Sequence, residues 1–325
     1  MNSTITRRSF IKQTGFGVAA ASAAGVGISC EKPVKVVVEE MPRRILGKTG
    51  LEISQLSFGG GSQFLKNKDG DWELILEQAL NLGINVFDTA SSYQWGASMS
   101  SEQRFGKILS LHRDKIFIST KFDSRKPDEA MKEIEKSLTD MKTDYIDILL
   151  LHSVEKSEDL DDFADGIYPM MLKLKEEGVA KFIGFSSMNS AEKSRDLINR
   201  FDIDACILAM NPTKYGNFVE IALPAANAKN VGVFAMKVMR DIVGNKATAE
   251  ELIAYALDKE GVASACIGHF GRNTLEENAA IIANRPDGKK VILYDGNELE
   301  SRLAHISGPH ALCWARPDYF DGKMC

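Results

Sequence analysis

The chain has few cysteines, and none of them forms a paired motif. Its 325 residues include five cysteines without a CxxC spacing, so a metal or redox site built on paired thiols is not indicated. Cys206 and Cys266 lie in apolar runs, where a small buried thiol is the ordinary case. Cys313 and Cys325 remain free to pair, and an oxidising compartment would permit that bond.

An excess of positive charge is also absent, and so is a long hydrophobic run. Forty Lys and Arg residues stand against forty-five Asp and Glu residues, which gives a formal net charge of −5. Basic residues form a block only at the amino end, so a nucleic-acid partner is not expected. The most apolar stretch, FGVAAASAAGVGIS, is about 15 residues long and too short for a permanent membrane span.

That apolar stretch belongs to an apparent export signal. Arg7 and Arg8 precede it, followed by a phenylalanine and a lysine, and this order is typical of a twin-arginine signal peptide. Its glycines disfavour a stable helix interior, which argues against a buried core helix. We therefore expect residues 1–30 to be a signal peptide and residues 31–42 a linker.

The signal predicts where the protein acts. Cleavage near Ala21–Ala24 would release it outside the cytoplasm, in the periplasm or otherwise exported, with the twin-arginine translocation machinery as a partner during export. Lipid attachment at Cys30 is the weaker alternative, because the large aliphatic residue usual three positions before such a cysteine is missing.

Eight apolar runs alternate with helix-like stretches along the rest of the chain. The runs are QLSFGG, INVFDTA, KIFISTKF, YIDILLLH, KFIGFSS, DACILAMN, VGVFAMK and ASACIGH. Such an alternation is typical of a parallel sheet covered on its outer face, and eight units close into a barrel. We predict an α/β fold, a (β/α)8 TIM barrel over residues 43–295, with a polar C-terminal tail over residues 296–325.

Two local patterns refine this fold. The stretch RRILGKTGLEIS places Lys48, Thr49 and Gly50 between two short apolar pieces, which predicts a small hairpin before the barrel. An open doubly wound sheet is the competing topology. Its first strand, turn and helix would carry spaced glycines that open directly into the helix, and SFGGGSQFLKNKDGDW lacks that spacing.

Polar residues at the ends of consecutive runs form the candidate catalytic site. Asp88 follows INVF, Lys121 follows FIST and His152 follows ILLL, while Tyr93 lies in the loop after Asp88. The carboxyl ends of barrel strands meet at one rim. There a lysine would lower the pKa of the tyrosine hydroxyl, an aspartate would keep the lysine charged, and a histidine would orient a substrate oxygen. Each residue singly has an ordinary structural explanation, but their joint placement favours catalysis.

This set resembles the aldo-keto reductase family from Arg43 to Ala283. GINVFDTASSYQWG carries the family's Asp and Tyr, ISTKF its Lys and ILLLHSV its His, and GFSSMN, AMNP, FAMKVM and IGHFGRNTLEEN follow in the family order. The resemblance implies a barrel that binds NADPH, or alternatively NADH, across its rim and reduces aldehydes or ketones. Tyr93 would protonate the alkoxide that forms when hydride adds to the carbonyl.

The resemblance also implies residues that bind the cofactor. They are Gly60, Ser186, Ser187, Met236, Lys237, Arg272, Glu277 and Asn278. The two serines would hold the nicotinamide carboxamide, although the family commonly has Asn at the second position, and the methionine stands where many members stack an aromatic ring. Lys237 would neutralise the pyrophosphate, and Arg272 would bind the 2′-phosphate. Glu277 and Asn278 would bond to the adenine.

The substrate side is less defined. Trp95 would form an apolar wall of the substrate pocket, and Asn211 would cap the turn made by Pro212. The substrate is expected to be a small carbonyl compound or alcohol, and no loop contains a pattern that identifies it. A barrel that must load a dinucleotide made in the cytoplasm would fold before export, which agrees with the signal peptide.

Two other functions stay open. One is a non-catalytic binding or regulatory subunit that resembles the family, and the complete set of Asp88, Tyr93, Lys121 and His152 argues against it. The other is suggested by relatives whose C-terminal cysteines hold an iron–sulfur cluster. Two cysteines at this end of the chain are too few for four thiolate ligands.

Overall fold

A closed barrel of eight parallel strands forms the body of the protein. The computed structural model describes residues 41–244, 246–284 and 294–321, so the predicted signal peptide lies outside the described residues. The strands follow the order β10-β3-β4-β5-β6-β7-β8-β9 around the barrel, and β10 closes it by pairing with β3. This confirms the predicted (β/α)8 TIM barrel. The strands are β3 (Leu56–Gly59), β4 (Val86–Asp88), β5 (Phe117–Phe122), β6 (Ile146–Leu151), β7 (Ala180–Ser187), β8 (Ala205–Ala209), β9 (Gly232–Met236) and β10 (Val262–Gly268).

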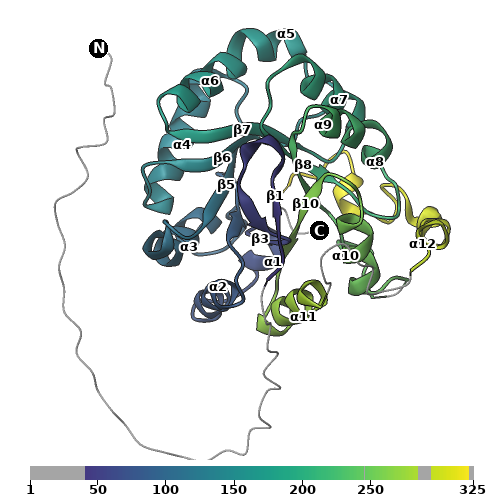
Figure 1. Cartoon of the computed structure of the whole chain (residues 1–325). Coiled ribbons are helices and arrows are strands. Elements are labelled where there is room, and N and C mark those ends of the chain that lie inside the picture. Colours follow the sequence, from purple (N-terminus) through teal and green to yellow (C-terminus); the bar gives the residue numbers. More distant parts are fainter. Residues whose placement is uncertain (1–40, 245, 285–293, 322–325) are drawn as a thin grey trace, which may run out of the picture. The chain divides into compact units, whose positions relative to one another are not determined.

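Helices surround the strands, as the view along the barrel in Figure 1 shows. They are α1 (Ser62–Leu65), α2 (Asp71–Asn81), α3 (Ser101–Ile108), α4 (Pro127–Met141), α5 (Leu160–Asp162), α6 (Tyr168–Glu176), α7 (Ala191–Arg200), α8 (Phe218–Ile221), α9 (Leu223–Ala228), α10 (Ala249–Leu257), α11 (Arg272–Ala283) and α12 (Gly296–Leu303). Each of the eight apolar runs became a strand, because a strand with the packed barrel interior on one face and helices on the other must be apolar on both. Within the described residues, no helix combines the length and the hydrophobicity needed to cross a membrane.

Close backbone contacts fix parts of the barrel wall. A Cβ atom at Gly184 in β7 would lie 1.8 Å from the carbonyl oxygen of Ala205 in the neighbouring β8. A contact this short involves backbone on both sides, so neither strand can yield without breaking the ladder between them. Only glycine fits at this position.

The predicted hairpin is present at the amino end of the barrel. Strands β1 (Arg43–Ile45) and β2 (Glu52–Ser54) pair antiparallel, joined by a 3-10 turn over Gly47–Thr49. The amide of Lys48 donates to the carbonyl of Asn230, just before β9 begins. The hairpin therefore covers the end of the barrel opposite to the strand ends that carry the predicted catalytic residues.

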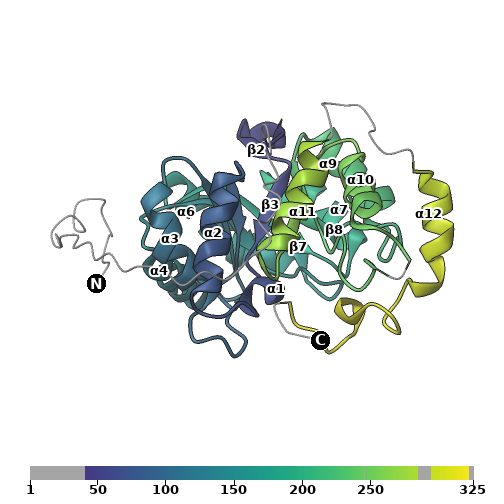
Figure 2. The same cartoon turned by 90° about the horizontal axis from the view of Figure 1, so that it is seen from below.

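The C-terminal segment packs more extensively than a polar tail would. Helix α12 buries Leu299 and Leu303, and its Glu300 accepts a hydrogen bond from Tyr255 in α10 at 2.7 Å. Further along, Leu312 and Trp314 are fully buried. Figure 2 shows the hairpin strand β2 at one end of the barrel and the last described residues at the other. The expectation of a polar tail over residues 296–325 needs correction, because the described part of this segment contains a helix and buries apolar side chains.

Candidate active site

The four predicted catalytic residues meet at the carboxyl ends of the strands. The ammonium of Lys121 donates to Asp88 Oδ2 at 2.6 Å and to the carbonyl of Thr89 at 2.7 Å. The same ammonium lies 5.1 Å from the centre of the Tyr93 ring. The rings of Tyr93 and His152 meet edge to face, with centroids 5.6 Å apart. The structure therefore brings together residues from β4, β5, the loop after β4 and the loop after β6.

Local backbone contacts place these side chains. Asp88 is the last residue of β4 and pairs with Ser119 of β5, so its carboxylate and Lys121 project from neighbouring strands. The amide of Ser91 donates to the carbonyl of Lys121, which ties the loop of Tyr93 to β5. The Tyr93 ring also packs against Leu65 and Ala90 in a small apolar cluster.

The ion pair between Lys121 and Asp88 lies in the interior of the barrel. The side chains are 1% and 8% exposed. Asp88 Oδ1 is buried and has no hydrogen-bond partner among the described residues, and the thiol of Cys266 lies 3.7 Å from Oδ2. A buried pair of this kind is costly to break, because the remaining charge has no water to solvate it.

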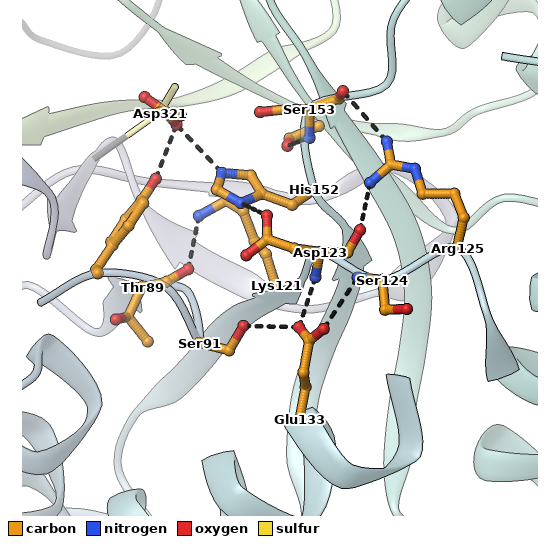
Figure 3. Close-up of polar contacts among 12 residues, drawn as sticks. Thr89, Ser91, Lys121, Asp123, Ser124, Arg125, Glu133, His152, Ser153 and Asp321 are labelled. Atoms are coloured by element: carbon orange, nitrogen blue, oxygen red, sulfur yellow. Dashed lines mark hydrogen bonds and ion pairs between the residues drawn. The ribbon is translucent and has the colours of Figure 1, made fainter. Parts of the chain in front are cut away.

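A fifth residue, which the sequence analysis did not identify, lies at the centre of the site. Asp321 Oδ2 accepts a hydrogen bond from the Tyr93 hydroxyl at 2.8 Å and lies 3.3 Å from His152 Nε2. Its other oxygen, Oδ1, pairs with the ammonium of Lys237 and accepts a hydrogen bond from the Tyr319 hydroxyl at 3.0 Å. Asp321 is buried. In Figure 3 its carboxylate faces the ring of His152.

The electrostatics of Tyr93 differ from the prediction. We expected Lys121 to lower the pKa of the hydroxyl. Burial raises the pKa of Tyr93 well above its usual value instead, and the carboxylates of Asp321 and Asp88 raise it further. The prediction is wrong for this arrangement because a carboxylate touches the hydroxyl, whereas the Lys121 ammonium is bound by Asp88. The carboxylate itself is stabilised, since Lys237 and His152 outweigh burial and hold the pKa of Asp321 well below the usual range.

His152 is held by a second carboxylate that the sequence analysis also missed. Its Nδ1 lies 2.7 Å from Asp123 Oδ1, and the two face each other in Figure 3. Glu133 of α4 fixes Asp123 by accepting from its backbone amide at 2.7 Å. Burial alone would lower the pKa of His152, but the hydrogen bonds and charges of Asp123 and Asp321 raise it overall. A signal was available in its position, because Asp123 directly follows the last residue of β5 and so lies at the carboxyl-end rim of the barrel.

Replacing Asp123 by Asn should lower the pKa of His152, because a neutral amide no longer favours the imidazolium. A histidine whose folded pKa is raised stabilises the fold below its unfolded pKa of about 6.5, and this stability is lost as the pH rises through the folded pKa. Asp123→Asn should therefore cost about 1 kcal/mol more free energy of unfolding at about pH 6 than at about pH 9.

NMR titration of the His152 ring and urea unfolding at the two pH values measure these effects. The exposed Asp144 bears no hydrogen bond or ion pair among the described contacts, so Asp144→Asn is the matched control. An equal cost at both pH values, with the titration of His152 unmoved, would show that Asp123 does not act through the histidine.

The predicted carboxamide ligands are engaged with backbone. The Ser186 hydroxyl accepts from the amide of Ser153 at 2.9 Å, and the Ser187 hydroxyl donates to the carbonyl of Val154 at 2.7 Å. Both hydroxyls therefore fix the loop after β6. Asn211 caps its turn as predicted, accepting from the amide and the hydroxyl of Thr213 at 3.0 and 2.6 Å.

The residue after β9 lies close to the predicted catalytic residues. Met236, the last residue of β9, is buried. Lys237 follows in a left-handed backbone conformation with φ of 56°, and its ammonium contacts both Asp321 and the Tyr319 hydroxyl. We expected this lysine beside a pyrophosphate. In the described arrangement its ammonium pairs with Asp321, next to the predicted catalytic side chains. Arg240 donates to the Ser62 hydroxyl at 2.6 Å and so joins the segment after β9 to the start of α1.

The remaining predicted cofactor residues lie after β3 and around α11. Gly60 has no room for a side chain, because a Cβ atom there would be 2.9 Å from the backbone oxygen of Asp88. Arg272 and Glu277 are exposed at the start and middle of α11, whereas Asn278 is buried on its packed face. The contacts that bring the four predicted catalytic residues together do not include these positions.

Trp95 lines a small pocket together with Ser62 and Leu65, and Leu65 also packs against Tyr93. Trp95 also contacts the ring of Phe320, with centroids 6.1 Å apart. Cys206 and Cys266 are free thiols, as expected, and Cys313 is disulfide-bonded. Cys325, the other cysteine that the sequence leaves free to pair, lies outside the described residues. Among the described residues, no group of three or more His, Cys, Asp or Glu side chains could hold a metal ion.

The fold and this constellation define a class of barrel proteins in which Asp, Tyr, Lys and His share one rim of a (β/α)8 barrel. Residues 55–241 match the model of the aldo/keto reductase family. Since this match covers more than half of the sequence, the chain belongs to the aldo/keto reductase family.

Individual relatives agree with this membership. The chain is 34% identical over 157 residues to L-galactose dehydrogenase of Arabidopsis thaliana, and the match covers 45% of this chain and 48% of that protein. It thus spans about half the length of this relative. It is 27% identical over 284 residues to an uncharacterised oxidoreductase of Bacillus subtilis, covering 73% of this chain and 90% of the relative. A solved aldo-keto reductase structure from Pseudomonas aeruginosa superposes with a TM-score of 0.65 at 25% identity, covering 77% of this chain and 98% of that one.

Proposed function

We propose that the protein is an NADP(H)-dependent oxidoreductase that reduces an aldehyde or ketone to an alcohol, or catalyses the reverse reaction. The observation that carries this proposal is the buried pair of Lys121 and Asp88 beside the Tyr93 ring, with the His152 ring edge to face against that same ring. A scaffold without catalytic activity has no use for a buried charge pair at this place, which costs free energy to desolvate. The dehydrogenase name of the Arabidopsis relative agrees with the proposal.

In this reaction Tyr93 is the proton donor. A bound reduced nicotinamide supplies the hydride. Tyr93 gives its proton to the carbonyl oxygen as negative charge develops there, and His152 orients the same oxygen by a hydrogen bond from Nε2. Lys121 and Asp88 fix the position of the tyrosine ring, and Asp123 fixes the ring of His152. In the reverse direction Tyr93 would accept the proton from the alcohol.

The rim offers groups suited to the phosphates of a dinucleotide. Helix α11 begins at Arg272 after Gly271, and no side chain caps its first turn. Uncapped amide groups and the positive end of the helix dipole favour an anion there, and the exposed guanidinium of Arg272 adds a charge that can bind a phosphate through two hydrogen bonds. These features support Arg272 as the group that binds the 2′-phosphate of NADPH.

Replacing Arg272 by Ala tests this assignment and the cofactor preference together. If Arg272 binds the 2′-phosphate, it should contribute about 1.5–3 kcal/mol, or roughly a ten- to hundredfold preference for NADPH over NADH. Arg272→Ala should remove this preference by lowering the affinity for NADPH and leaving the affinity for NADH nearly unchanged. Fluorescence titration of both cofactors into both proteins measures the effect.

The exposed Lys132 on α4 provides the control, because Lys132→Ala removes one positive charge far from α11. An equal loss of affinity for NADPH and for NADH would indicate that Arg272 has a structural role at the start of the helix. Absence of any nicotinamide binding, together with no consumption of NADPH or NADH in the presence of a carbonyl, would favour the non-catalytic subunit instead.

We also propose that the protein is exported by the twin-arginine pathway, on the evidence of its first thirty residues alone. Replacing Arg7 and Arg8 by Lys should retain the full-length protein in the cytoplasm, folded and active. Cell fractionation with immunoblotting checks this outcome. Normal export of the lysine variant would count against the twin-arginine assignment.

A further inference from the structure

The chain places its own carboxylate on the groups that the proposed reaction needs. The Tyr93 hydroxyl donates to Asp321 Oδ2 at 2.8 Å, and His152 Nε2 lies 3.3 Å from the same oxygen. Lys237 pairs with the other oxygen. These three groups belong to the barrel, and all three face a single carboxylate that reaches them from residue 321 of the chain.

This contact excludes a substrate from the same position. The Tyr93 hydroxyl has one proton to donate, and in this arrangement Asp321 accepts it. A carbonyl oxygen that Tyr93 is to protonate must lie within hydrogen-bond distance of the same hydroxyl. Asp321 and the substrate oxygen therefore cannot both occupy the site.

The residues before Asp321 hold it in place. Phe320 lies against the rings of Trp95 and His152, with centroid distances of 6.1 and 6.3 Å. The Tyr319 ring lies under the cations of Lys237 and Arg240, at 5.1 and 5.5 Å from its centre. The chain thus covers the catalytic groups with two aromatic rings and one carboxylate.

A short exposed stretch connects residues 319–321 to a buried residue, Trp314, which we call the anchor. Trp314 is fully buried and packs edge to face on Tyr215, with centroids 5.4 Å apart, and the Tyr215 hydroxyl donates to the carbonyl of Ala315. Residues 316–318 are exposed. Exposed residues make few packing contacts, so the departure of residues 319–321 from the site need not disturb the packing of the anchor, Trp314.

We propose that Tyr93, His152 and Lys237 form a carboxylate-binding site that the chain fills with its own Asp321, and that a carbonyl substrate reaches Tyr93 only after this carboxylate has left. The ligand class of the site is a small monocarboxylate. The claim that substrate enters only after Asp321 has left rests on the reductase function proposed above. The carboxylate-binding site itself is independent of that function.

Binding of acetate tests the site without turnover. Acetate carries the same carboxylate as the Asp321 side chain, so Asp321→Ala should bind acetate at least about tenfold more tightly than the wild-type protein, in which the site is filled. Neutral acetamide has the same shape and should bind to neither. Saturation-transfer NMR on the purified proteins measures the binding, and Asp318→Ala, which changes an exposed aspartate of the same segment, should behave as wild type.

Quenching of tryptophan fluorescence tests whether the segment leaves. Trp72 and Trp314 are fully buried, whereas Trp95 is partly exposed and touches Phe320, so acrylamide reports chiefly on Trp95. Asp321→Asn removes the charge and keeps the shape. It should increase quenching and raise kcat/KM for a small carbonyl such as methylglyoxal about tenfold, as expected if the free protein is open about a tenth of the time. Asp318→Asn should change neither.

The outcomes separate the two proposals. Equal acetate affinity in wild type and Asp321→Ala would overturn the carboxylate site. Increased quenching in Asp321→Asn with an unchanged or lower kcat/KM would overturn the requirement that the carboxylate leave. If neither wild type nor Asp321→Asn consumes NADPH or NADH with any carbonyl, the reductase function fails, and the acetate measurement still decides the site.

Discussion

Tyr93→Phe should lower the rate of carbonyl reduction about a thousandfold or more, while the affinity for the nicotinamide cofactor stays nearly the same. General acid catalysis contributes about 10²–10⁴-fold to a rate, and no other described hydroxyl lies within the Tyr93, His152 and Asp321 cluster except that of Tyr319. The Tyr93 hydroxyl acts on the alkoxide that develops in the transition state, so its loss should reduce kcat and kcat/KM together.

The measurement is steady-state reduction of a small carbonyl, with cofactor titration by fluorescence in parallel. Tyr145→Phe is the matched control. The Tyr145 hydroxyl donates to the carbonyl of Arg113 at 3.3 Å, and the residue directly precedes β6 at the amino end of the barrel. A Tyr93→Phe protein that keeps most of its rate would remove Tyr93 from the mechanism. Loss of cofactor affinity in the same variant would instead indicate a role in binding.

The positions of Asp88, Lys121 and His152 could be predicted because barrel topology determines them. Each follows an apolar run, and each run became a parallel strand, so their carboxyl ends had to meet at one rim. Neither the exact contacts nor the charges were needed for this prediction. The hairpin and the helices were predictable for another reason, since the turn residues of the hairpin and the amphipathic periods of the helices are local features of the sequence.

Asp321 could not be predicted in this way because its position depends on the path of the C-terminal segment. It lies 228 residues from Tyr93 in the chain, and it reaches the site through the packing of Leu312 and Trp314 in a stretch with no periodic pattern. Lys237 shows a related limit. Its place directly after β9 was predictable. Its backbone, however, is left-handed with φ of 56°, a conformation that is unusual for a lysine and has no signal in the sequence.

The presence of Asp321 also changes how the pKa of Tyr93 should be understood. The sequence pattern suggested a tyrosine acidified by lysine, yet burial and two carboxylates raise the pKa of Tyr93 in this arrangement. Departure of Asp321 would remove one of these carboxylates and allow Lys237 to act on the site without a counter-charge. The Tyr93 hydroxyl therefore has a lower proton affinity after Asp321 has left than while Asp321 occupies the site. Tyr93 is thus the stronger acid when substrate can enter.

Lys121→Met should destabilise the protein by about 3–5 kcal/mol, since it leaves the Asp88 carboxylate buried without its counter-charge. Asp88 Oδ1 already lacks a hydrogen-bond partner among the described residues, so little else is available to compensate the charge. The double variant Asp88→Asn with Lys121→Met has no buried charge at this place. It should recover most of the free energy of unfolding lost in the single variant, because a neutral pair of similar volume is often as stable as a buried ion pair.

Activity should not recover with stability. Lys121 fixes the environment of the Tyr93 ring at 5.1 Å, and the neutral pair cannot replace this charge, so the double variant should remain at least about a hundredfold slower than wild type in carbonyl reduction. Urea unfolding and steady-state kinetics on wild type, both single variants and the double variant complete a cycle that separates the two effects. A double variant as unstable as Lys121→Met would show that the lysine stabilises the barrel through packing and not through its charge. A double variant with wild-type activity would remove the ion pair from catalysis, and Tyr93 would then depend on His152 and Lys237 alone.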